Sequence, residues 1–280
     1  MRQIYLLFWI LTINYTLKGQ IDVPSKDLLK DFLKTKTCFV IDDNPFSECN
    51  IQLKSAAEKF WKLTPFEIIG IDEFEKRRFN KQYSFVSIDE VYFDNTKNPV
   101  KYKFLSIYLG GNYKTESNMP QICNIPLAYL DEDEANYCYK TATLLIFAQN
   151  HILTLINHPE LKNNNIIDYY LKNKDDISKK TLLIVPDDIE PQLRSEKKFS
   201  QIYPYNFKFT THDEIEKAID NKDPDVIFLH KVGTKKNGAR IYKAILDTKN
   251  AQLYYFDYHI FSNAKPDALL ESDIKKLISK

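Results

Sequence analysis

The chain has 280 residues, of which 39 are Lys or Arg and 38 are Asp or Glu, so its formal net charge is +1. This balance excludes the strongly basic surface that nucleic-acid binding requires, and a hydrophobic fraction of 44% excludes a wholly disordered chain. Six glycines leave little room for glycine-rich phosphate loops, and we predict no cofactor. The length accommodates one or two domains.

The first 19 residues are predicted to form a secretory signal peptide. Arg2 precedes an apolar run at residues 4–13, which has the length of a signal-peptide core and is too short for a membrane span of about 20 residues. Gly19 provides a small residue before a cleavage point, and an uncleaved anchor is the alternative. Cleavage would remove Arg2 and Lys18 and change the net charge from +1 to −1. We therefore expect an exported protein, periplasmic or extracellular, with no transmembrane segment in the mature chain.

Residues 20–130 are predicted to form a first α/β unit. The apolar run at 38–41 is typical of a strand buried on both faces of a parallel sheet. Ser47 is the expected cap of the following helix, and Pro126 indicates that the last strand lies at a sheet edge. In chain order the expected elements are a helix at 25–34, a strand at 38–41, a helix at 47–62, a strand at 66–69, a short helix capped by Asp72, and strands at 83–86, 102–109 and 125–129.

Residues 131–162 are predicted to form a long buried helix that connects two units. Asp131 and Glu134 fit a capping box, and residues 141–156 are apolar on nearly every side, which is typical of a buried helix. A continuous helix from Asp131 to Pro159 would be about 40 Å long at 1.5 Å per residue. Polar residues at 149–151 argue against a membrane span.

Residues 163–280 repeat the order of the first unit. The expected elements are a helix at 166–171, a strand at 182–185, a helix around Phe199, a strand at 206–209, a helix at 213–218, strands at 226–229, 241–246 and 252–258, and a C-terminal helix. Phe60 and Phe199 match at a separation of 139 residues, and Asp72 and Asp213 at 141. A fixed period indicates duplication. We therefore predict an α/β fold of two tandem β-α-β-α-β-β units with mixed sheets. A single larger α/β domain is the alternative.

Four cysteines, Cys38, Cys49, Cys123 and Cys138, lie in the first half of the chain. An oxidising compartment permits disulfides, and four cysteines allow three full pairings. The simplest hypothesis pairs neighbours in sequence, Cys38 with Cys49 and Cys123 with Cys138. A buried strand thiol at Cys38 is an equal alternative. The spacings match no zinc motif, so we predict no metal.

Paired aspartates follow the first strand of each unit. Asp42 and Asp43 follow the strand at 38–41, and Asp187 and Asp188 follow the strand at 182–185. Ligands of open α/β sheets bind at this edge, where carboxylates can hold a divalent cation or act as acid and base. The alternative is a helix N-terminal turn. His230, after the third strand of the second unit, is a further candidate.

Two stretches of the second half, DVIFLHKVG at 225–233 and YYFDYH at 254–259, resemble an uncharacterised family of exported Bacteroidetes proteins. The resemblance implies export and assigns no residue a role. The leading hypothesis is an exported, non-catalytic envelope or secreted protein that presents α/β surfaces to a protein or glycan partner. The alternative is a metal-assisted hydrolase that uses the paired aspartates at the strand ends.

Overall fold

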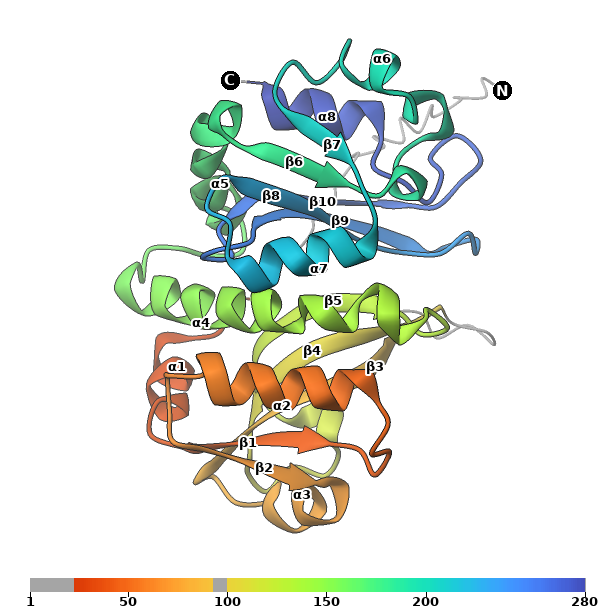
Figure 1. The fold of residues 1–280 in the computed structure, drawn as a ribbon. Helices are drawn as coiled ribbons and strands as arrows, with labels where there is room; N and C mark the ends of the chain where they lie inside the picture. Colours follow the sequence, from red (N-terminus) through yellow and green to blue (C-terminus); the bar gives the residue numbers. More distant parts are fainter. Residues whose placement is uncertain (1–22, 93–99, 280) are drawn as a thin grey trace, which may run out of the picture.

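The computed structural model describes residues 23–92 and 100–279. They form two α/β units, each with a five-stranded mixed sheet (Figure 1), so the predicted fold class is confirmed. The predicted signal peptide lies outside the described residues, and its cleavage stays a prediction. Within the described ranges, no helix combines the length and the apolar character needed to cross a membrane.

The sheet of the first unit has the strand order β2-β1-β3-β4-β5. β1 runs parallel to β2 and β3, whereas β3, β4 and β5 are antiparallel neighbours. The strands are β1 (Lys36–Ile41), β2 (Phe66–Gly70), β3 (Tyr83–Tyr92), β4 (Lys101–Leu109) and β5 (Gln121–Tyr129). The helices are α1 (Lys26–Phe32), α2 (Glu48–Phe60) and α3 (Ile71–Arg77), with a 3-10 turn η1 (Glu116–Asn118). β5, which contains Pro126, is an edge strand as predicted.

The sheet of the second unit has the equivalent order, β7-β6-β8-β9-β10. The strands are β6 (Thr181–Ile184), β7 (Phe207–Phe209), β8 (Val226–Val232), β9 (Arg240–Asp247) and β10 (Leu253–Ile260). The helices are α5 (Ile166–Leu171), α6 (Glu196–Phe199), α7 (His212–Asn221) and α8 (Glu271–Ile278), with 3-10 segments η4 (Lys172–Lys179), η5 (Pro186–Asp188) and η6 (Pro191–Leu193). β6 is parallel to β7 and β8, and β8, β9 and β10 are antiparallel, so the strand directions repeat as well.

The two units are alike in detail, and each has the five strands expected in chain order, one more than the β-α-β-α-β-β formula counts. Phe60 and Phe199 end α2 and α6, and Asp72 and Asp213 are the second residues of α3 and α7, so the residues matched by sequence occupy equivalent places. Ser47 caps α2, as expected. The predicted Asp72 cap is wrong: β2 runs directly into α3, whose N-cap residue is Gly70.

The connecting segment contains a shorter helix than predicted. α4 (Thr141–Asn157) has 17 residues, about 26 Å at 1.5 Å per residue, and the 3-10 turns η2 (Glu134–Asn136) and η3 (Cys138–Lys140) precede it. The helical path is broken at Tyr137, which has φ −142°. Asp133 caps the first of these turns by accepting a hydrogen bond from the Ala135 amide. The expected single helix over 131–162 is therefore wrong.

α4 lies between the two units in Figure 1. Its buried face packs on the first unit, where the Gln149 side chain accepts a hydrogen bond from the Lys62 amide and donates one to the Phe60 carbonyl at the end of α2. On the side of the second unit, His151 Nδ1 lies 2.7 Å from the hydroxyl of Tyr170 in α5. One apolar core extends from α2 through α4 to Leu246 of β9, so the units share a core.

The disulfide joins Cys49, at the start of α2, to Cys138 in η3. The predicted pairing of sequence neighbours is therefore wrong. Cys38 and Cys123 are buried thiols, and burial raises the pKa of Cys38 to about 11 and that of Cys123 to about 12. The alternation of side chains along β1 explains why Cys38 does not pair with Cys49: it packs with Phe74 on the face of the sheet opposite α2.

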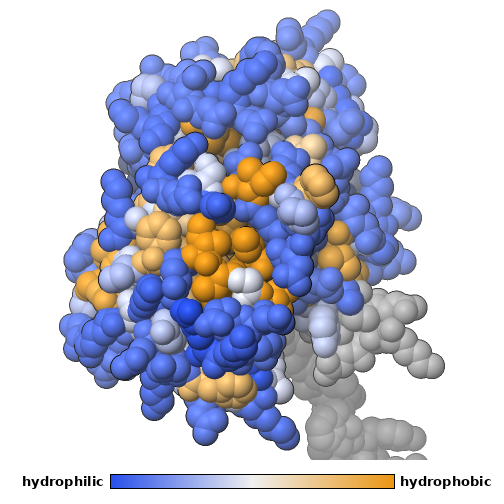
Figure 2. All heavy atoms as spheres, turned by 60° about the horizontal axis from the view of Figure 1, so that its bottom comes forward, coloured by the Kyte–Doolittle hydropathy of each residue, from blue (hydrophilic) through white to orange (hydrophobic). Residues whose placement is uncertain are grey.

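The face of the molecule drawn in Figure 2 is mostly hydrophilic, with apolar residues gathered in a central hollow. Among the described residues, the large apolar side chain with the greatest exposure is Phe46, at 88%. It lies in the loop between β1 and α2 and is therefore available to a partner.

Candidate functional site

A polar crevice lies at the carboxyl ends of β1 and β3. From β1 the chain passes first to β2 on one side and then to β3 on the other, so this is the topological switch point at which open α/β sheets bind ligands. The cavity here has a volume of about 420 Å³; we call it the first-unit crevice. Its lining includes one ammonium group, that of Lys103, and six carboxyl groups, those of Asp42, Glu75, Asp89, Glu90, Glu116 and Glu134.

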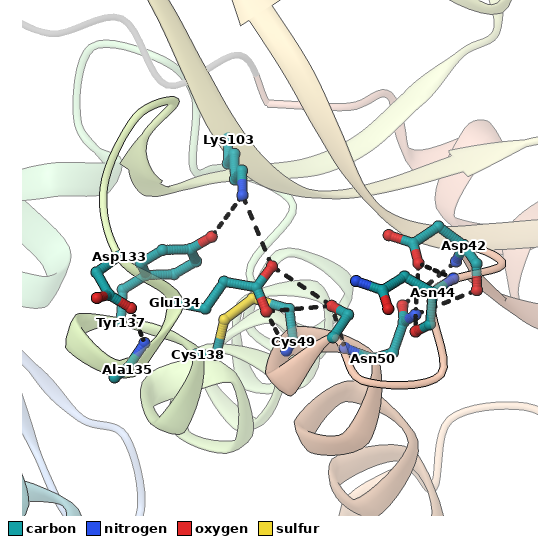
Figure 3. A network of polar contacts seen from close by, with 11 residues as sticks. Asp42, Asn44, Cys49, Asn50, Lys103, Asp133, Glu134, Ala135, Tyr137 and Cys138 are labelled. Carbon is teal, nitrogen blue, oxygen red and sulfur yellow. Dashed lines mark hydrogen bonds and ion pairs between the residues drawn. A yellow bond between two sulfur atoms is a disulfide. The ribbon is translucent and has the colours of Figure 1, made fainter.

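The loop after β1 is held by Asn50, from the first turn of α2 (Figure 3). The Asn50 side-chain amide donates to the Asp42 carboxylate at 2.7 Å and to the Asn44 carbonyl at 3.0 Å. The Asp42 carboxylate also accepts the Asn44 amide at 2.8 Å. Asp42 therefore closes an Asx-type turn and lines the crevice, whereas Asp43 is exposed beside it. The turn considered for Asp42 is therefore present, and its carboxylate also lines the crevice.

The N-terminus of α2 binds a carboxylate of the chain itself. Glu134 accepts hydrogen bonds from the Ser47 hydroxyl at 3.2 Å and from the Cys49 amide at 3.3 Å. On the other side it pairs with Lys103 at 3.9 Å, and Lys103 donates to the Tyr137 hydroxyl at 2.7 Å (Figure 3). A helix N-terminus favours an anion, and Glu134 fills that place here. This position is therefore not open to a phosphate ligand.

A relay of hydrogen bonds reaches the half-buried carboxyl group of Asp89 in β3. The Ser87 hydroxyl donates to Asp89 at 2.5 Å, so the Tyr108 hydroxyl, 2.8 Å from the Ser87 oxygen, donates to Ser87. Burial raises the pKa of Asp89, and the hydrogen bond from Ser87 partly offsets this. Burial also raises the pKa of Tyr108, so the phenol remains protonated.

Glu75 and Glu116 complete the acidic wall. Burial and the nearby Glu75 carboxylate raise the pKa of Glu116. Glu75 forms an ion pair at 2.8 Å with Arg78, which does not itself line the crevice. Lys101 likewise binds Glu90 at 3.2 Å. The six carboxyl groups still outnumber the three cations that pair with them, Lys103, Arg78 and Lys101. The crevice therefore has a negative potential, which favours cationic groups and groups rich in hydroxyl donors.

The aspartates of the second unit do not join those of the first. Asp187 is exposed and pairs with Arg194 at 3.0 Å, whereas Asp188 pairs with Lys231 at 3.5 Å. Lys231 is further bound to Asp267 at 2.7 Å. Figure 1 shows β1 and β6, which these aspartates follow, on separate sheets.

Among residues 23–92 and 100–279, one group of side chains lies close enough together to bind a metal ion. It consists of Cys49, Glu134 and Cys138, whose ligand atoms lie within 4.8 Å of one another. The two sulfur atoms are joined in the disulfide, so neither is a thiolate ligand. Neither aspartate pair belongs to such a group. The hypothesis of a metal held by the paired aspartates therefore gains no support from the geometry.

His230 lies on β8 at the boundary between the units, away from the first-unit crevice. Its Nε2 is 2.8 Å from the carbonyl oxygen of Pro126 in β5. The sequence pattern gave no sign of this contact, because 104 residues separate the two. Nor did it identify Glu134 and Lys103 as crevice residues, since both come from segments remote from β1.

Comparisons with protein-family models, with curated proteins and with solved structures found no match to this chain. The resemblance to exported Bacteroidetes proteins therefore stays a prediction.

Proposed function

We propose that the chain is an exported, non-catalytic binding protein for a protein or glycan partner, and that the first-unit crevice receives a cationic, hydroxyl-bearing group of that partner. The observation that carries the proposal is the concentration of six carboxyl groups around one cavity at the switch point of the sheet. Such a wall accepts hydrogen bonds from ammonium and hydroxyl groups and repels phosphate.

The crevice is organised before a partner arrives. Asn50 fixes the Asp42 loop, and the α2 N-terminus together with Lys103 fixes Glu134. Groups that are already ordered lose less conformational entropy on binding. Phe46, in the loop that borders the crevice, adds an exposed ring that can stack on a sugar or on an apolar side chain.

The competing metal-assisted hydrolase needs the paired aspartates to act together. Asp42 closes a turn in the first unit, and Asp188 is neutralised by Lys231 in the second. These placements favour the binding function over the hydrolase.

The test uses two oligosaccharides with the same sugar framework: a glucosamine tetramer, which carries ammonium groups, and its N-acetylated counterpart, which does not. Tetralysine serves as the protein-derived cation. We expect titration calorimetry at low salt to detect binding of a cationic ligand and much weaker binding of the acetylated sugar. Preference between the glucosamine tetramer and tetralysine distinguishes a glycan from a protein partner.

The matched variants carry the same change of charge at two different places. Glu75→Gln/Glu116→Gln removes two crevice carboxylates, and we expect about tenfold weaker binding, since each exposed pair contributes up to about 1 kcal/mol. Asp27→Asn/Asp31→Asn removes two exposed carboxylates near α1 and should leave binding unchanged. Equal binding of the charged and acetylated sugars, or equal effects of the two variants, would contradict the proposal.

A further inference from the structure

A second cavity lies between the two units, and its chemistry differs from that of the first-unit crevice. Its volume is about 260 Å³, and its walls come from β5 and α4 on one side and from β8, β9 and β10 on the other. We call it the inter-unit cavity. It is partly open to the surface, and Ala244 in its wall is half-buried.

A small residue, Ala244, lies in the wall of the cavity between larger neighbours. Ala244 of β9 is paired in register with His230 of β8 and with Phe256 of β10. The next positions on the same face of β9 are the large residues Tyr242 and Leu246, both of which line the cavity. The small side chain of Ala244 therefore leaves space in this wall between the side chains of Tyr242 and Leu246.

The lining of the inter-unit cavity is mainly apolar and aromatic. Phe147 of α4, Phe104 of β4, Tyr242 of β9 and Phe256 of β10 all line it, and the rings of Phe104 and Tyr242 meet edge to face at 6.1 Å. An apolar cavity of about 150 Å³ takes up benzene. A cavity of 260 Å³ is therefore large enough for a fused two-ring molecule.

One lining residue, His230, carries a buried polar atom without a hydrogen bond to the part of the chain that the structure describes. His230 is only 3% exposed, and its Nε2 must carry the proton because the Pro126 carbonyl can only accept. Its Nδ1 is then an acceptor, and it has no partner among the described residues. Burial lowers the pKa of His230 to about 3, so this acceptor persists at neutral pH. Leaving a buried acceptor unpaired is costly, and a ligand with a donor removes that cost.

We infer that the inter-unit cavity binds a small, mostly apolar molecule the size of one or two fused rings, which carries one hydroxyl or N–H group that donates to Nδ1 of His230. This ligand class is independent of the cationic partner proposed for the first-unit crevice. The aromatic walls provide the affinity, and His230 selects for the donor.

The experiment compares 2-naphthol with naphthalene and 2-methoxynaphthalene, which share its framework and lack the donor. Binding to the full chain is measured by fluorescence titration at neutral pH. We expect 2-naphthol to bind about tenfold more tightly than the other two, the factor that corresponds to one net hydrogen bond.

Two variants test the location. Ala244→Phe fills the cavity and should abolish binding of all three probes, whereas His230→Phe should reduce 2-naphthol to the affinity of naphthalene. His158→Phe, at an exposed histidine outside the cavity, is the matched control and should bind as the unaltered chain does. Circular dichroism establishes that each variant is folded, and a variant that fails to fold is replaced by Leu246→Phe or His230→Leu. Equal affinities for 2-naphthol and 2-methoxynaphthalene, no binding of any probe, or retained binding in the filled variant each overturns the inference.

Discussion

Removal of the Cys49–Cys138 disulfide should destabilise the protein strongly. The bond closes a loop in which the two cysteines are 89 residues apart. In the chain-entropy description, a loop of this length restricts the unfolded chain by about 15 cal/mol/K, which corresponds to about 4.6 kcal/mol at 25 °C. This is a large fraction of the total stability of about 5–15 kcal/mol that is usual for a folded chain.

The double variant Cys49→Ser/Cys138→Ser tests this magnitude. Equilibrium unfolding in guanidinium chloride should show a free energy of unfolding about 3–5 kcal/mol below that of the unaltered chain. Reductant provides the internal control: it should lower the stability of the unaltered chain by a similar amount and leave the double variant unchanged, since Cys38 and Cys123 are not cross-linked. A loss below 1 kcal/mol, or equal effects of reductant on both proteins, would refute the reasoning.

Three further predictions concern buried groups. Burial lowers the pKa of His151 to about 4, so below pH 6.5 the unfolded chain takes up a proton that the folded chain does not. The free energy of unfolding, measured at several pH values, should therefore fall by up to about 3 kcal/mol between pH 6.5 and 4. In His151→Gln the fall should be less steep. Asp273→Asn leaves the buried Lys243 ammonium without its carboxylate partner at 2.7 Å and should lower the free energy of unfolding by about 3–5 kcal/mol. The double variant Lys243→Met/Asp273→Leu should lose much less than the sum of the two single changes. Gly110→Ala places a methyl group 2.5 Å from the Asn80 carbonyl oxygen and should lower the free energy of unfolding by about 1–3 kcal/mol, and an unchanged melting curve would contradict it.

Local patterns were sufficient to predict most of the secondary structure. The apolar run of β1, the Ser47 cap of α2 and the proline of the edge strand β5 each depend on neighbours within a few residues. The period of about 140 residues was sufficient to indicate two units, because equivalent residues such as Asp72 and Asp213 start equivalent helices.

The candidate sites depend on contacts that local patterns do not encode. The predicted capping box of Asp131 and Glu134 is wrong: Asp133 caps that turn, and the Glu134 carboxylate binds the start of α2, 85 residues earlier. Cys138 pairs with Cys49 because η3 brings it to the same place. The inter-unit cavity arises from the packing of two sheets around Ala244, a residue unremarkable in the sequence. Only the tertiary arrangement defines these features.

The core shared through α4 limits how independently the two halves of the chain can vary. A chain of two repeats joined by a loose linker would let each half evolve alone. Here Ala148 and Ile152 of α4 lie in one cluster with Leu53 of α2 and Phe228 of β8. A substitution at any of these positions therefore has to fit packing partners from both halves, and we expect the two units to unfold in one transition.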